Sequence, residues 1–127
     1  MTAEYQVNGA IAVITLNNPP VNGLGLSTRT AVVENMRKAL ADGAVKAIVI
    51  TGAGKAFCSG QDLKASASAG KRSFKESLDK RYNPIIRAIR RVPKPVICRL
   101  NGVAAGAGCS IALACDMIVA SNEASLI

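Results

Sequence analysis

The sequence contains no histidine and no tryptophan, and aromatic residues make up only 3% of its 127 residues. The absence of histidine excludes a Ser-His-Asp triad and leaves few ligands for a zinc site. The four cysteines form no C-x-x-C pair, so we expect no bound metal. The scarcity of aromatic side chains removes the stacking platform used by single-strand binders, which argues against a nucleic-acid partner.

Long hydrophobic runs are also lacking. The longest apolar stretch covers 16 residues between Arg99 and Asp116 and is rich in glycine and alanine. It is too short to span a membrane, and it predicts a buried helix. The start, Met1 to Glu4, has no signal-peptide pattern, and the cysteines have apolar or small neighbours. We therefore expect reduced thiols, a cytoplasmic location and no membrane partner.

Positive charge is concentrated in one segment. The chain carries a net charge of +8, and residues 71–94 contain nine basic and two acidic side chains, a surplus of seven. A solvated helix face explains this surplus most simply. The alternative is attraction of a polyanionic ligand, either a phosphorylated cofactor or a nucleic acid. Since half of all residues are hydrophobic, residues 1–127 can bury one core.

Alternating β-branched runs and helical spacing predict a mixed α/β chain. Two strands flanking Asn8-Gly9 predict a β-hairpin, and the prolines at 19 and 20 predict a loop. A helix is expected to begin at Ser27, to bury one face and to end before Gly43. The buried face comprises Val32, Val33, Met36 and Leu40. Further strands are predicted over 47–51, 95–98 and 117–120, with helices over 73–91, split at Pro84, and 107–115.

Two turns rich in small residues follow two of these strands. Residues 57–63 read Phe-Cys-Ser-Gly-Gln-Asp-Leu, and residues 101–108 read Asn-Gly-Val-Ala-Ala-Gly-Ala-Gly. A turn after a strand exposes unpaired backbone N–H groups at the carboxyl edge of a sheet, where ligands of open α/β sheets bind. The two turns can therefore aim two donors at one oxygen.

These motifs resemble the crotonase family, the enoyl-CoA hydratase/isomerase superfamily. The resemblance covers the whole chain and includes the hairpin with Asn18 to Asn22, residues 46–52, residues 93–97 and Ala114 to Asp116. It implies an α/β crotonase (ClpP-like) spiral of ββα units. The turns, together with Arg81 to Pro84, look most like the branch that isomerises 1,2-epoxyphenylacetyl-CoA. The opening hairpin looks like the hydratase domains of bifunctional β-oxidation enzymes.

The resemblance also implies a site for an acyl-CoA thioester. The family's oxyanion-hole donors correspond to the backbone N–H groups of Gln61 and Ala107, with Gly60, Gly106 and Gly108 supporting the turns. No separate cofactor is implied, because coenzyme A enters as part of the substrate. Lys64 could meet its phosphates. The other residues that the resemblance places along the substrate are Val21, Asn22, Cys58, Asp62 and Leu63.

The carboxylates depart from the family pattern. Ser110 stands where a hydratase has a glutamate, which favours an isomerase, because moving a double bond needs only one base. Asp62 and Asp116 are expected to make structural hydrogen bonds, Asp116 at the start of a buried strand. The second family carboxylate would fall beyond Ile127, so no residue of this chain is assigned as the general base.

Length is the second departure, since family members are about twice as long. We therefore expect residues 1–127 to be the N-terminal part of a crotonase domain, without the C-terminal part and the helices through which members form trimers or hexamers. The expected parent activity is acyl-CoA isomerisation. The alternatives are 2-enoyl-CoA hydration, a catalytically inactive acyl-CoA-binding fragment, a short CoA-binding module and a basic nucleic-acid module.

Overall fold

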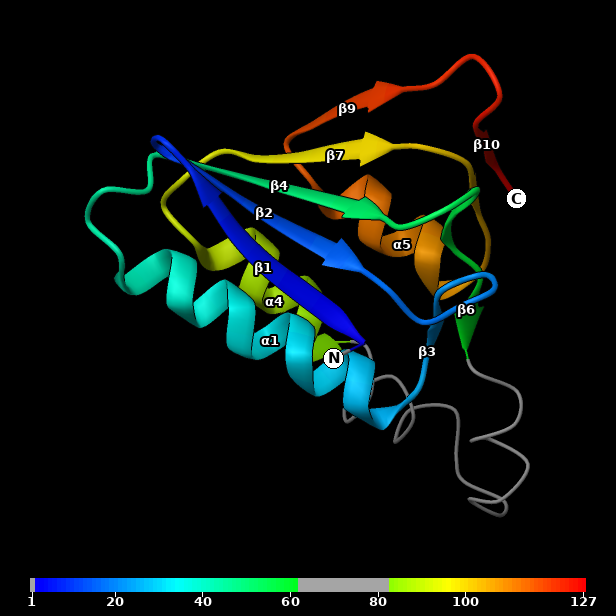
Figure 1. Cartoon of the computed structure of the whole chain (residues 1–127), viewed down its shortest axis with the longest axis horizontal. Helices are drawn as coiled ribbons and strands as arrows, with labels where there is room; N and C mark the ends of the chain where they lie inside the picture. Colours follow the sequence, from blue (N-terminus) through cyan, green and yellow to red (C-terminus); the bar gives the residue numbers. More distant parts are fainter. Residues whose placement is uncertain (1, 62–82) are drawn as a thin grey trace.

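The computed structural model describes residues 2–61 and 83–127, and a five-stranded sheet lies at its centre (Figure 1). The sheet order is β1-β2-β4-β7-β9. β1 and β2 are antiparallel, whereas the remaining neighbours are parallel. The carboxyl ends of four strands therefore lie at one edge. The strands are β1 (Ala3–Asn8), β2 (Ile11–Leu16), β4 (Ala47–Gly52), β7 (Val96–Leu100) and β9 (Met117–Ala120).

The predicted hairpin is present, but its turn is displaced by one residue. Asn8 pairs with Ile11, so the two loop residues are Gly9 and Ala10. Gly9 has φ 60°, a left-handed conformation that suits glycine at the first central position of a tight hairpin turn. The prediction that Asn8-Gly9 forms the turn is therefore wrong by one position.

Helix α1 (Leu26–Ala41) contacts β1 and β2 with one face. Two details of its prediction are wrong. The N-cap is Gly25 and not Ser27, which lies inside the first turn. Leu40 is 49% exposed, because Ala39 takes the inward position at that turn. The buried residues of this face are Thr28, Val32, Asn35, Met36 and Ala39.

Helix α4 (Asn83–Arg91) contacts both α1 and α5 (Ala107–Ala114), and these three helices lie together in Figure 1. Ile85 and Ile89 are buried, as helical spacing predicted. Pro84 is the second described residue of α4, and the helix runs on from it to Arg91. Residues 73–82 of the predicted helix lie outside the described residues, as do the basic side chains between 71 and 81.

The core lies between the helices and the sheet. β9 differs from its prediction: all four of its residues are exposed, and Met117 and Val119 are both 60% exposed. It forms the edge of the sheet in this chain, so the expectation of a buried strand after Asp116 is wrong. No helix in the described part of the chain is long and apolar enough to cross a membrane. The largest fully buried apolar side chains are Phe57, Ile14, Leu16, Ile48, Ile50 and Ile85.

Short strands continue beyond the carboxyl edge of the main sheet and carry both small-residue turns. β8 (Val103–Ala104) pairs in parallel with β5 (Ala56–Cys58) on one side and with β10 (Ser125–Leu126) on the other. β3 (Gly23–Leu24) pairs with β6 (Gly60–Gln61). The turn after β5 and the turn after β8 are thereby brought to the same end of the fold.

Candidate functional site

The two turns lie directly against each other. The N–H of Ala105 donates to the carbonyl oxygen of Cys58 at 3.0 Å, which ties the second turn to the first. A Cβ atom added to Gly60 would lie 2.7 Å from the oxygen of Ala105 and 3.2 Å from the nitrogen of Ala107. Gln61 follows Gly60 directly. The two segments that carry the predicted donors therefore adjoin, although they are more than 40 residues apart in sequence.

Glycines permit this close approach. Gly60 has φ 93° and Gly106 has φ 54°, backbone conformations that L residues rarely adopt. A side chain at Gly108 would collide with the carbonyl oxygen and Cβ of Cys58. All three glycines predicted to support the turns thus occupy positions that require glycine for conformation or space.

Ala107 is the first residue of α5. Its N–H has no backbone acceptor within residues 2–61 and 83–127, as expected for the first turn of a helix. The helix dipole favours negative charge at this end. Ala107 as a whole is half-buried. The arrangement can stabilise an oxyanion.

Gln61 is the last residue of β6, which pairs with β3 at Leu24. Its backbone is described and its side chain is not. The predicted ligand contacts of Asp62, Leu63 and Lys64 fall outside the described residues. Their assignment therefore stays a prediction from the family resemblance.

Asn22 has a structural role that the sequence did not indicate. Its side chain is only 1% exposed, and its backbone adopts φ 57°. The amide nitrogen donates to the carbonyls of Ala53, Ala56 and Phe57 at 3.0, 2.9 and 3.2 Å. Since this carboxamide faces protein atoms, only the backbone of Asn22 could line a bound CoA. Its neighbour Val21 is exposed.

Cys58 is likewise enclosed by protein. Its side chain is fully buried, and burial raises the pKa of the thiol to about 11, while a hydrogen bond from the Gly60 N–H lowers it by less. The thiol is therefore neutral at physiological pH and packs beneath the turn. All four cysteines are free, as the sequence predicted.

Asn101 was not singled out as a site residue from sequence, yet it braces the same region. Its Oδ1 accepts from the N–H of Gly52 at 3.1 Å, and its Nδ2 donates to the carbonyls of Gly54 and Ala56, both at 3.1 Å. The one available signal is its place between the end of β7 and Gly102. A side chain at Gly102 would collide with the Lys55 carbonyl.

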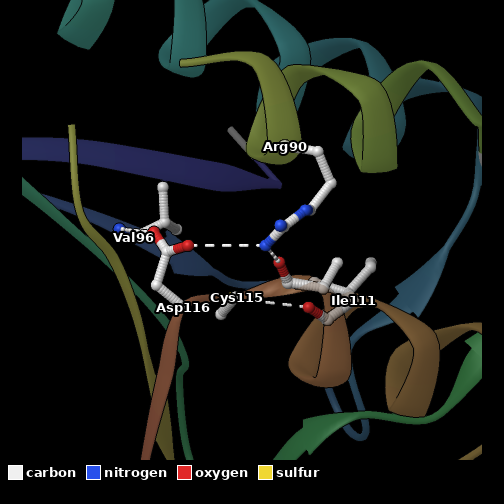
Figure 2. A network of polar contacts seen from close by, with 6 residues as sticks. Arg90, Val96, Ile111, Cys115 and Asp116 are labelled. Carbon is white, nitrogen blue, oxygen red and sulfur yellow. Dashed lines mark hydrogen bonds and ion pairs between the residues drawn. The ribbon is translucent and has the colours of Figure 1, made fainter. Parts of the chain in front are cut away.

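The far end of α5 is anchored by the network in Figure 2. Asp116 Oδ2 accepts the N–H of Val96 at 2.8 Å, and Arg90 Nη1 lies 3.4 Å from Asp116 Oδ1. The same Arg90 nitrogen donates to the carbonyl of Ala114 at 3.2 Å, and Cys115 Sγ donates to the carbonyl of Ile111. The structural hydrogen-bonding role predicted for Asp116 is confirmed. Its carboxylate is occupied at the end of α5 opposite Ala107.

Among residues 2–61 and 83–127, few acid–base side chains are close in sequence to the turns. Ser110 is exposed on α5, and its N–H donates to the carbonyl of Gly106 at 3.3 Å. Glu123 is also exposed. In the described ranges no group of three or more histidine, cysteine, aspartate or glutamate side chains could hold a metal ion.

Comparisons with known proteins agree with this geometry. A family model described as enoyl-CoA hydratase/isomerase matches residues 6–127. The chain is 41% identical over 125 residues to a probable enoyl-CoA hydratase of Rhodobacter capsulatus, covering 98% of this chain and 48% of that protein. It is 34% identical over 125 residues to the 1,2-epoxyphenylacetyl-CoA isomerase of Escherichia coli, covering 95% of this chain and 48% of that protein.

Solved structures show the same relationship. An enoyl-CoA hydratase/isomerase from Xanthobacter autotrophicus superposes with a TM-score of 0.92 at 35% identity, covering 99% of this chain and 48% of that one. An enoyl-CoA hydratase from Bacillus anthracis superposes with a TM-score of 0.91 at 28% identity, covering 99% of this chain and 50% of that one. The chain thus spans about half the length of these relatives. It has the crotonase fold, and it belongs to the enoyl-CoA hydratase/isomerase family.

Proposed function

We propose that this chain forms the oxyanion-binding part of an enzyme that isomerises acyl-CoA thioesters through an enolate. The observation that carries the proposal is the contact between the turn at Gly60-Gln61 and the turn at Ala107. The thioester carbonyl oxygen would accept hydrogen bonds from the N–H groups of Gln61 and Ala107. Each such donor is worth about 3 kcal/mol in comparable sites.

In the proposed reaction a base removes a proton from the carbon next to the thioester carbonyl. The C–H electron pair forms a C=C bond, and the carbonyl π electrons move to oxygen, which becomes the enolate oxyanion. In a substrate with a C=C bond between carbons 3 and 4, the enolate is conjugated with that bond. When the oxyanion re-forms the carbonyl, the electrons of the 3,4 C=C bond take up a proton at carbon 4. The C=C bond then lies between carbons 2 and 3. No separate cofactor is needed, because the thioester belongs to the substrate.

The base is assigned to no residue of this chain. Asp116 already bonds to Val96 and Arg90, and Ser110 has no carboxylate. A location beyond Ile127 stays a prediction. The same applies to a homo-oligomeric state for the longer protein.

Hydration of 2-enoyl-CoA is the alternative reaction, and the Rhodobacter relative supports it by name. Ser110 weighs against it, because water addition uses two acid–base groups. An inactive acyl-CoA-binding fragment needs only the two donors. Turnover assays distinguish the reactions: double-bond migration without hydroxyacyl product supports isomerisation, and hydroxyacyl product supports hydration.

Difference infrared spectroscopy tests the shared step in this chain. Acyl-CoA carrying a ¹³C-labelled carbonyl should show a lowered C=O frequency when bound. Ala107→Pro removes one N–H and should reduce that shift. A wild-type spectrum identical to that of free acyl-CoA, in a sample saturated with ligand by calorimetry, would contradict the proposed function.

A further inference from the structure

We propose that Asn22 and Asn101 are positioning residues: their carboxamides set the spacing and orientation of the two backbone donors in the oxyanion site. This inference rests on the proposed function. It assigns a task to two side chains that do not touch the substrate themselves.

The two side chains converge on one carbonyl group. The oxygen of Ala56 accepts from Asn22 Nδ2 at 2.9 Å and from Asn101 Nδ2 at 3.1 Å. A carbonyl oxygen has two lone pairs, so both are used. Ala56 begins β5, which leads through Cys58 directly to Gly60 and Gln61. The position of Ala56 therefore fixes the start of β5, the strand that leads to the donor residue Gln61.

Each asparagine also holds the surrounding loop. Asn22 Oδ1 accepts from the N–H of Asn18 at 2.9 Å, and its amide nitrogen also donates to the carbonyls of Ala53 and Phe57. Nearby, the carbonyl of Val21 accepts from the N–H of Ser59 at 2.9 Å. The loop that contains Asn22 is thus bonded to both ends of β5.

Asn101 connects this segment to the second turn. It follows β7 and lies two residues before β8. It bonds to Gly52, the last residue of β4, and to Gly54 in the loop that precedes β5. β8 continues into the turn that ends at Ala107. A displacement of Asn101 would therefore move the segment that carries Gln61 relative to the turn that carries Ala107.

The hydrogen bonds from Asn22 to Ala56 and Phe57 are buried, and the bond from Asn101 to Ala56 is partly buried. Polar groups removed from water are costly to leave unpaired, so these bonds resist displacement. An oxyanion site depends on such resistance, because its donors must already point to where the charge develops. The pair of asparagines provides that rigidity from outside the substrate pocket. Because two amides share one acceptor, a change at either residue should affect the donor geometry.

The test compares carbonyl polarisation in matched variants. Asn101→Asp keeps the shape and the acceptor for Gly52 but turns a second oxygen toward the carbonyls of Gly54 and Ala56. Asn101→Ala removes the amide without adding charge. Asn35→Asp is the control. Asn35 is buried, whereas Asn101 is half-buried, and among the described residues the Asn35 amide donates only to the carbonyl of Ala3, on β1. The readouts are the affinity for acetyl-CoA and the C=O frequency of the bound ligand.

We expect both Asn101 variants to bind acetyl-CoA within about threefold of wild type and to lose at least half of the frequency shift, whereas Asn35→Asp retains it. An unchanged shift in the Asn101 variants would overturn the inference. An equal loss in Asn35→Asp would also overturn it, because general destabilisation would then explain the effect. If neither Asn101 variant folds, the inference is also overturned, because Asn101 would then have a role in stability alone. A wild-type protein without any shift would instead refute the proposed function.

Discussion

Replacing Gly60 with alanine should destabilise the protein more than the same replacement at Gly54, an exposed glycine. Gly60 has φ 93°, and the added Cβ would lie 2.7 Å from the Ala105 oxygen. Gly54 is the matched control: it has φ 77° and no atom within 4 Å of the added Cβ. Both substitutions incur the conformational penalty, but only Gly60→Ala adds a collision with the second turn.

The magnitudes can be separated. The left-handed conformation should cost each alanine variant about 1–2 kcal/mol of unfolding free energy. Overpacking against a backbone that must shift adds about 1–3 kcal/mol at Gly60 alone. In urea or thermal unfolding, Gly60→Ala should therefore be less stable than Gly54→Ala by about 1–3 kcal/mol. Acyl-CoA bound to the folded Gly60→Ala protein should also show a smaller carbonyl shift.

Equal stability of the two alanine variants would refute this reasoning. It would mean that Gly60 does not face the Ala105 carbonyl across the two turns. Loss of stability in Gly60→Ala with a carbonyl shift equal to that of wild type would separate folding from function. In that case the turn contact would be structural, and it would not orient the donors.

Two further predictions concern stability. Lys94 Nζ donates to the carbonyls of Ala39, Leu40 and Asp42 at the C-terminal end of α1. Lys94→Met should therefore lower the unfolding free energy by about 1–2 kcal/mol more than Lys46→Met, which replaces an exposed lysine. Equal melting temperatures of the two variants would contradict this prediction. Burial raises the pKa of the Cys58 thiol to about 11 in the folded chain, whereas the usual thiol pKa of 9 applies in the unfolded chain. As the pH rises, the thiol therefore loses its proton first in the unfolded chain. The unfolding free energy should therefore fall between pH 9 and 11, and Cys58→Ala should fall less steeply; parallel slopes would argue against a buried thiol.

Much of the fold could be predicted because local patterns and tertiary structure agree. The β-branched run at 47–51 forms the central strand β4, and the spacing of Ile85 and Ile89 correctly identified the buried face of α4. The errors occur where local rules compete. Ser27 is a favoured cap residue, but the N-cap is Gly25 and the helix begins at Leu26. The exposed β9 lies at a sheet edge, and no local pattern reveals which strands will be edges.

The site was predictable in outline for a similar reason. The small-residue turns after two strands are visible in the sequence, and the family resemblance assigned Gly60 and Gly106 to them; both glycines have positive φ in the structure. The roles of Asn22 and Asn101 could not be predicted, because asparagine is common in loops and the sequence does not show which carboxamides bond to distant carbonyls. Their shared acceptor, Ala56, is separated from them by 34 and 45 residues. Only the folded chain reveals that contact.

The most direct test of the oxyanion site is the amide proton of Ala107 in an NMR titration with acetyl-CoA. If the thioester oxygen accepts from Gln61 and Ala107, both amide protons should move downfield as ligand is added. The amide of Ala124, already bonded to the Ser121 carbonyl at 3.0 Å, serves as the internal control and should move little. Saturation of binding with the Ala107 and Gln61 amides unmoved would contradict the account.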